Sequence, residues 1–193
     1  MGVLWRDVLV SDHVVGSDGL TAEVGGVVEM SLHLHCRELT LLGKDEPPGP
    51  RVPEGYGEPG QRWVQDLVGQ VAEGRSGIWA DGWVLDVDGL ALYVDGTAVP
   101  EPGGWVRATG ELSIAEAYET DAFEPGEELV RKAERSWLVR RIVRVDRQSG
   151  GPGARHRTRH VEVDVMRFGP GRRRGGWWTV GYLLDLDGAA AAP

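Results

Sequence analysis

The sequence predicts a mostly β protein, an antiparallel barrel with extra flanking strands and one short helix. Apolar and polar residues alternate with period two over residues 28–37, which is typical of a half-buried strand. Asp-Gly pairs occur five times, and the 193 residues include 29 Gly and 11 Pro, as expected for many turns between short strands. Because no series of long helices alternates with these strands, a parallel α/β sheet is not expected.

The N-terminal residues predict strands. Residues 3–15 are expected to form one or two strands before a turn at Asp18-Gly19. In residues 28–37 the apolar positions fall on one parity, and Leu39 and Leu41 continue on the other parity. A β-bulge or bend near Arg37–Glu38 is therefore expected.

Residues 45–62 are rich in proline and glycine, which excludes a helix or a central strand. We expect a long exposed loop here, and it marks the only internal boundary that the composition indicates. The predicted organisation is then an N-terminal strand region over 1–44, this loop over 45–62, a barrel over 63–147, and a basic loop with a C-terminal hairpin over 148–193.

The clearest hairpin pairs residues 83–87 with 90–94 across Asp88-Gly89. An Asp-Gly pair between alternating strands predicts a type I′ turn, because both turn residues need positive φ. Val87 should then face Leu90. One face of the hairpin is expected to be buried, and Val84, Asp86, Ala91 and Tyr93 are expected on the other face.

The remaining elements follow from local signals. Residues 105–114 and 137–145 read as strands, and residues 125–135 as the one helix, with Pro125 at its start and acidic residues in its first turn. Residues 148–160 are expected to form a basic loop. Residues 161–168 and 177–186 are expected to pair as a hairpin.

The stretch from Trp63 to Val145 resembles an OB-fold. Its five expected strands are residues 63–71, 78–87, 90–94, 105–114 and 137–145, and the string from Gly104 to Ile114 looks like the fourth strand of such barrels. Gly69 stands where these barrels bend their first strand. The chain departs from the pattern in one respect, because the gap 95–104 is too short for the helix that usually lies between the third and fourth strands. A generic closed or half-closed β-barrel is therefore the alternative.

Composition bounds the location and chemistry of the chain. Cys36 is the single cysteine, so an internal disulfide or a Cys-x-x-Cys site is excluded. No apolar stretch approaches 18 residues, and the first residues do not resemble a secretory signal. We expect a cytoplasmic protein without membrane contact.

Charge is distributed unevenly along the chain. Residues 1–130 contain 7 basic and 24 acidic side chains, whereas residues 131–174 contain 14 basic and 4 acidic ones. The basic tract either binds an anionic partner or folds back on the acidic remainder of the chain. Its arginines include Arg140, Arg141, Arg144, Arg147, Arg155, Arg157, Arg159, Arg172, Arg173 and Arg174. Aromatic residues lie nearby in sequence at Trp137, Phe168, Trp177 and Trp178.

Arginine combined with aromatic rings on a β-barrel is the chemistry of single-stranded nucleic-acid binding. We expect a non-catalytic module that binds single-stranded nucleic acid or an acidic protein, and no cofactor. The candidate residues are Tyr93, Trp105, Arg107, Arg155, Arg157, Arg159, Arg172, Arg173 and Arg174.

Two other functions stay open. His33 and His35 are two residues apart on one strand, so their imidazoles point the same way and could begin a metal site. The unequal charge of the two regions could also mediate self-association in a scaffold protein without a small ligand. Cys36 falls on the apolar parity of its strand, which favours an inert buried thiol over a nucleophile.

Overall fold

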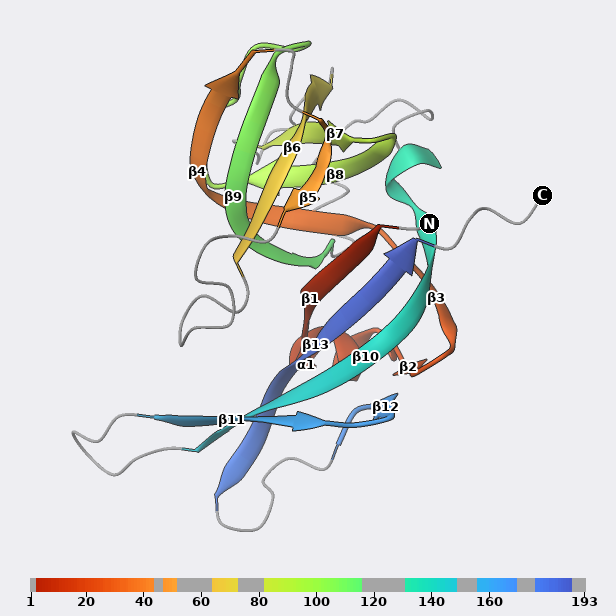
Figure 1. The fold of residues 1–193 in the computed structure, drawn as a ribbon. Helices are drawn as coiled ribbons and strands as arrows, with labels where there is room; N and C mark the ends of the chain where they lie inside the picture. The colour runs from red at the N-terminus through yellow and green to blue at the C-terminus, as the bar shows by residue number, and fades with distance from the viewer. Residues whose placement is uncertain are drawn as a thin grey trace. The chain divides into compact units, whose positions relative to one another are not determined.

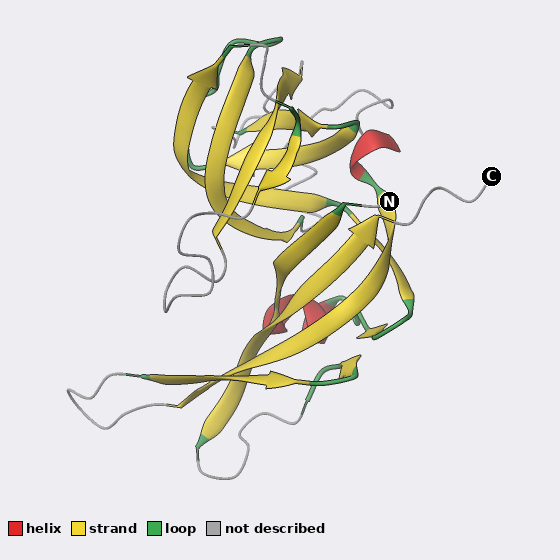
Figure 2. Ribbon diagram, in the orientation of Figure 1, coloured by secondary structure: helices red, strands yellow, loops and turns green. Residues whose placement is uncertain are grey.

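The structure of the protein is a computed structural model (Figure 1). It describes residues 3–43, 47–51, 64–72, 82–115, 131–148, 156–169 and 176–188. The chain divides into two compact units, one containing residues 29–136 and the other residues 2–28 and 137–193. Strands make up most of the described residues and the helices are short, as Figure 2 shows, which confirms the predicted fold class.

The first unit is a closed barrel of five strands. These are β4 (Leu32–Leu42), β6 (Val64–Ala72), β7 (Trp83–Val87), β8 (Leu90–Asp95) and β9 (Trp105–Ile114). Neighbours pair in the order β6–β7–β8–β4–β9, and β9 pairs with β6 to close the barrel. The barrel is mixed because β4 and β8 run parallel, whereas the other pairs are antiparallel. A short strand, β5 (Gly49–Arg51), pairs with β6 inside the segment that was expected to be loop.

The alternation over residues 28–37 is confirmed in the burial of its apolar positions, but the stretch forms two strands, β3 and β4, that are separated at Ser31. The apolar residues of one parity, including Leu32, Leu34 and Cys36, are buried in the barrel. The register with β9 shifts between Cys36 and Glu38, where the bulge was predicted. Beyond the bulge Leu41 is 73% exposed, so the apolar alternation ends before the strand does.

The β7–β8 hairpin has the predicted register and turn. Val87 faces Leu90, and Asp88 and Gly89 have φ of 54° and 80°. The expectation of a single buried face is corrected, because Val84, Ala91 and Tyr93 on the other face are buried as well. They pack in a small apolar cluster with Ala133, which belongs to a helical turn at residues 131–133.

The fifth strand of the barrel is not the one expected. Residues 137–145 lie in β10 (Arg135–Gln148), and all of them belong to the second unit. The place between β8 and β9 is taken by β4, which comes earlier in the chain. Local sequence signals specify strands but not their distant partners, and a parallel neighbour some 60 residues away leaves no turn signature. Of the expected helix 125–135, residues 125–130 lie outside the described residues.

The second unit is built on an antiparallel sheet in the order β11–β10–β13–β1. Its remaining strands are β1 (Leu4–Ser11), β11 (Arg157–Glu162) and β13 (Trp177–Gly188), and β3 (Val27–Met30) also pairs with β10. Outside this sheet, β2 (Ala22–Glu23) pairs with β12 (Val165–Met166). Trp5 and Trp137 meet edge to face in the core, with ring centroids 6.1 Å apart.

Two local predictions for this unit are wrong. Residues 12–15 form part of α1 (Asp12–Ser17) and not a strand; the Ser11 hydroxyl caps this helix by accepting a hydrogen bond from the Val14 amide. Residues 161–168 and 177–186 do not pair as a hairpin, because β10 lies between β11 and β13 and pairs with both. Trp137, Val139, Ile142, Val143 and Val145 of β10 are buried, as suits a central strand.

Candidate functional site

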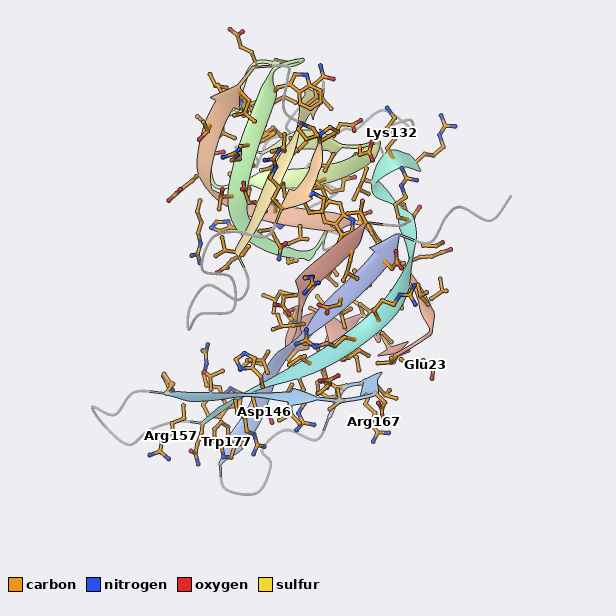
Figure 3. All side chains as sticks on the ribbon, in the orientation of Figure 1. Glu23, Lys132, Asp146, Arg157, Arg167 and Trp177 are labelled. Atoms are coloured by element: carbon orange, nitrogen blue, oxygen red, sulfur yellow. The ribbon has the colours of Figure 1, made fainter. Side chains whose placement is uncertain are left out.

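The sheet of the second unit ends in a basic, aromatic tip, which we call the ribbon end: residues 146–148 of β10, 157–160 of β11 and 177–179 of β13. Across these strands Asp146 stands between Arg159 and Thr179, and Gln148 stands between Arg157 and Trp177. Figure 3 labels Asp146, Arg157 and Trp177 at this end of the second unit. Facing residues of paired strands share one side of the sheet, so these side chains form one face of the ribbon end.

Asp146 organises this face. Its carboxylate is completely buried and accepts hydrogen bonds from Arg144 (Nε–Oδ1 2.9 Å), Arg159 (Nε–Oδ2 3.0 Å) and the Thr179 hydroxyl (3.1 Å). Burial alone would raise the pKa of Asp146, but these hydrogen bonds outweigh it and hold the pKa below its ordinary value. The carboxylate is therefore charged at neutral pH and fixes both guanidinium groups.

Arg159 is held from two sides. Its guanidinium carbon lies 4.5 Å from the centroid of the Trp177 ring, and its Nη2 lies 3.0 Å from the Asp146 Oδ2. The side chain is still 42% exposed, so N–H groups remain accessible to a ligand. Arg157, two residues away on the same edge strand, is exposed on the same face. Together the two arginines offer an anion a pair of donors, one of which is already oriented.

The opposite face of the ribbon end carries a second aromatic group. Trp178 follows Trp177 directly and so projects from the other face, where it stands across from Arg147. The imidazole of His156 meets the Trp178 ring at 6.4 Å and 89°, an edge-to-face contact. Arg147 and His156 are exposed, and the Trp178 ring is half-buried.

Two further arginines of the basic tract, Arg140 and Arg141, form ion pairs within the sheet. Arg140 pairs with Asp187 at 2.6 Å, and Arg141 pairs with Asp185 at 3.1 Å and lies 3.8 Å from Asp7. Burial would lower the pKa of Arg141, but its hydrogen bond to Asp185 and the nearby carboxylates raise it instead. This part of the tract folds back on carboxylates of its own unit, and exposed arginines remain at the ribbon end. The candidates Arg155, Arg172, Arg173 and Arg174 lie outside the described residues.

Among the three candidate residues on the barrel, Tyr93 is not available for stacking. Tyr93 is 3% exposed, and burial raises the pKa of its hydroxyl, so the ring offers no surface to a nucleobase. Its burial corrects the expectation that Tyr93 stacks on a ligand, and the cause is the second apolar cluster behind the β7–β8 hairpin. Trp105 is half-buried at the start of β9, and Arg107 lies 3.8 Å from Asp66.

His33 and His35 lie close to one carboxylate. Asp95 on the neighbouring parallel strand lies 2.7 Å from His35 Nδ1 and 3.5 Å from His33 Nε2. His33 is buried, although its strand parity predicted a solvated side chain. Within the described ranges, no group of three or more His, Cys, Asp or Glu side chains could hold a metal ion.

Cys36 is buried as predicted. Burial raises the pKa of its thiol, which donates a hydrogen bond to the Glu38 carbonyl at 3.2 Å. A thiol with a raised pKa carries little thiolate at neutral pH, so this environment does not activate it as a nucleophile.

Sequence reasoning identified Arg157 and Arg159 but missed the group that orders them. Asp146 is the only carboxylate between residues 135 and 161, and the spacing Arg144-x-Asp146 places both side chains on one face of a strand. That spacing was the available signal. The pairing of Asp146 with Arg159 depends on the β10–β11 register, which the sequence alone does not specify.

No helix within the described residues is both long and apolar enough to cross a membrane. No protein-family model, curated protein or solved structure matches the chain. The chemistry of the ribbon end is therefore the basis on which a function is assigned.

Proposed function

We propose that the protein is a non-catalytic binding module whose ribbon end binds single-stranded nucleic acid. The observation that carries this proposal is the arrangement of Arg159, which is fixed between the buried Asp146 carboxylate and the Trp177 ring with Arg157 beside it. A guanidinium held in place loses less conformational entropy on binding than a free one, so it is a better phosphate donor.

The favoured ligand follows from the combination of charge and aromatic rings. Arginines can contact successive phosphates, and the half-buried indoles offer stacking surface to unpaired bases, which duplexes do not present. An acidic protein would use the arginines but gains less from the rings. It is therefore the alternative outcome of the test.

Fluorescence anisotropy with labelled single-stranded DNA and RNA of about 20 nucleotides would measure binding at increasing salt. We expect affinity to fall steeply with salt, and the double variant Arg157→Ala/Arg159→Ala to weaken binding and to reduce the salt slope by about 1.4, or about 0.7 for each lost phosphate contact. Arg140→Ala is the matched control, because it removes an arginine that is paired with Asp187 away from the ribbon end.

Two results would contradict the proposal. The absence of salt-sensitive binding to any single strand at low ionic strength would remove it. Binding of poly-glutamate with the same affinity and the same dependence on Arg157 and Arg159 would instead assign the site to acidic proteins.

We also propose that the barrel is OB-like, with its fifth strand supplied from upstream in the chain. Strands β6, β7, β8 and β9 stand where the first four strands were expected, and β4 takes the fifth place. Gly69 supports the likeness: β6 pairs with both β7 and β9 around it, and a Cβ there would lie 2.4 Å from the Asp86 carbonyl oxygen. A permuted chain in which residues 29–43 follow residue 115 through a short linker should keep the same circular dichroism spectrum, and loss of the β signal would oppose the likeness.

A further inference from the structure

The two faces of the ribbon end carry similar chemistry. Arg157, Arg159 and Trp177 lie on one face, and Arg147 and Trp178 lie on the other. A protein that docks one flat face on its ligand needs such groups on that face alone. The second set therefore calls for a ligand that reaches both faces.

The two tryptophans are not equally available. The guanidinium of Arg159 lies over the Trp177 ring, so this indole supports the arginine. The imidazole of His156 meets the Trp178 ring edge to face, and His156 is an exposed residue directly before β11. Trp178 is thus the ring better placed to receive a base, with the cation of Arg147 across from it on β10.

The edge of the sheet connects the two faces. β11 pairs with β10 on one side, and no strand among the described residues pairs with its other side. Residues 157–160 are all exposed, and arginine alternates with threonine or histidine along them. The exposed arginines make this edge positively charged, so a flexible polyanion can pass around it.

We propose that a single strand of nucleic acid crosses the outer edge of β11, placing phosphates on Arg157 and Arg159 and a base on Trp178 beside Arg147. This inference rests on the proposed function and adds the path of the ligand and a nucleobase site. A duplex is too stiff to bend around one strand edge, because its persistence length is about 150 base pairs. The ligand class is therefore an unpaired strand long enough to reach from one face to the other.

The test compares variants of each face against single strands of increasing length, from about 3 to 20 nucleotides. Trp178→Ala should weaken binding of the longest strand by about tenfold or more, because loss of one stacked base has that effect. Arg147→Ala should weaken it several-fold. Both variants should bind the shortest strands as the unchanged protein does, since these reach only the face with Arg157 and Arg159.

Trp178→Phe tests stacking separately from folding. This variant keeps an aromatic ring and should recover most of the affinity that Trp178→Ala loses, and thermal melts should report the folded fraction of each variant. Arg147 is exposed, so Arg147→Ala leaves the fold intact and keeps the proposal testable if Trp178→Ala unfolds. Arg140→Ala again serves as the control.

The outcomes separate the two proposals. If Arg147→Ala and a folded Trp178→Ala variant bind all lengths like the unchanged protein while Arg157→Ala/Arg159→Ala is weakened, the strand stays on one face and the crossing is wrong, but the proposed function stands. Equal or tighter binding of a duplex of the same length overturns the crossing as well. If no single strand binds at all, both proposals fail.

Discussion

Asp146 contributes both to the stability of the fold and to the orientation of Arg159 at the proposed binding site. Its buried carboxylate binds two arginines from different strands and a threonine from a third. Removing one partner of a buried ion pair leaves the remaining charges unsatisfied, and such losses typically cost about 3–5 kcal/mol. The same removal would also release Arg159 from the position in which it lies over Trp177.

We predict that Asp146→Asn lowers the free energy of unfolding by about 3 kcal/mol at pH 7 and weakens nucleic-acid binding. Simple electrostatics predicts the opposite effect on binding, because the variant loses one negative charge. Urea denaturation and anisotropy measure the two quantities. Asp164→Asn, an exposed site with the same charge change, is the control, and tighter binding by Asp146→Asn would show that orientation of Arg159 is unimportant.

The depressed pKa of Asp146 predicts a pH dependence for the same pair of proteins. A carboxylate whose folded pKa lies below its unfolded value stabilises the fold fully above the unfolded value, near 3.9, and that contribution is lost as pH falls through the folded pKa. The stability difference between the unchanged protein and Asp146→Asn should therefore be constant from pH 7 to 5 and shrink below about pH 4. A difference that widened in acid would contradict the assigned hydrogen bonds.

Gly110 shows how a single missing side chain permits the barrel to close. A Cβ at Gly110 would lie 2.1 Å from the His35 carbonyl oxygen and 2.9 Å from the Cys36 Cα, beside the bulge in β4. Backbone atoms cannot move aside as a flexible side chain can. We predict that Gly110→Ala destabilises the protein by about 1–3 kcal/mol in urea denaturation, whereas Gly43→Ala, where a Cβ meets nothing within 4 Å, changes stability little.

At the scale of elements, the sequence predicts hairpins from local turn signals but does not predict which distant strands pair. The β7–β8 hairpin was predicted to the residue, because its turn needs two positive φ angles that Asp88-Gly89 supplies. The place of β4 beside β8 was not predicted, since a parallel pair carries no connecting turn. The order β11–β10–β13 was missed for a different reason: both pairs are antiparallel, and only tertiary packing selects β10 as the partner of both neighbours.

The hairpin turn yields a prediction at this scale. Gly89 has φ of 80° and its amide donates to the Asp86 carboxylate at 2.7 Å. We expect Gly89→Ala to destabilise the protein by about 1–2 kcal/mol, because a Cβ disfavours this left-handed conformation. Asp88→Gly, which relaxes the neighbouring position, should change the urea midpoint far less. Equal effects of the two substitutions would argue against a type I′ turn.

The sequence indicated the candidate site only through its composition, a group of arginines and tryptophans close together in the chain. Arginines near tryptophans predicted an anion-binding surface, and Arg157 and Arg159 are exposed at the ribbon end as that prediction requires. The sequence did not reveal that Arg140 and Arg141 are held by Asp187 and Asp185, because those contacts depend on the β10–β13 register. It also assigned Tyr93 to the surface, where strand parity alone was misleading.

At the scale of the whole molecule, one unit is inserted into the other. Residues 29–136 form the barrel unit, and the second unit is assembled from both ends of the chain. The chain leaves and returns at neighbouring points of the second unit, because Gly25 donates to the Val139 carbonyl at 2.8 Å and Val139 donates to the Gly26 carbonyl at 2.9 Å. Such geometry is typical of tolerated domain insertions.

This arrangement predicts that the second unit folds without the barrel. Replacing residues 29–136 by a short Gly/Ser linker should leave a protein that unfolds cooperatively and binds single strands with nearly unchanged affinity. Residues 29–136 expressed alone should not bind them. Calorimetry and anisotropy measure these properties, and binding by the isolated barrel unit would move the site away from the ribbon end.

The pairing of β1 with β13 can form only late during synthesis on the ribosome. The Asp7 amide donates to the Asp185 carboxylate, a bond that spans 178 positions of the chain. The first strand must therefore wait for its β13 partner until residues 177–188 have been made, whereas every barrel strand has been made by residue 114. A nascent chain stalled before β13 would leave the edge of β1 that pairs with β13 exposed, and this interval is when a chaperone would have most to protect.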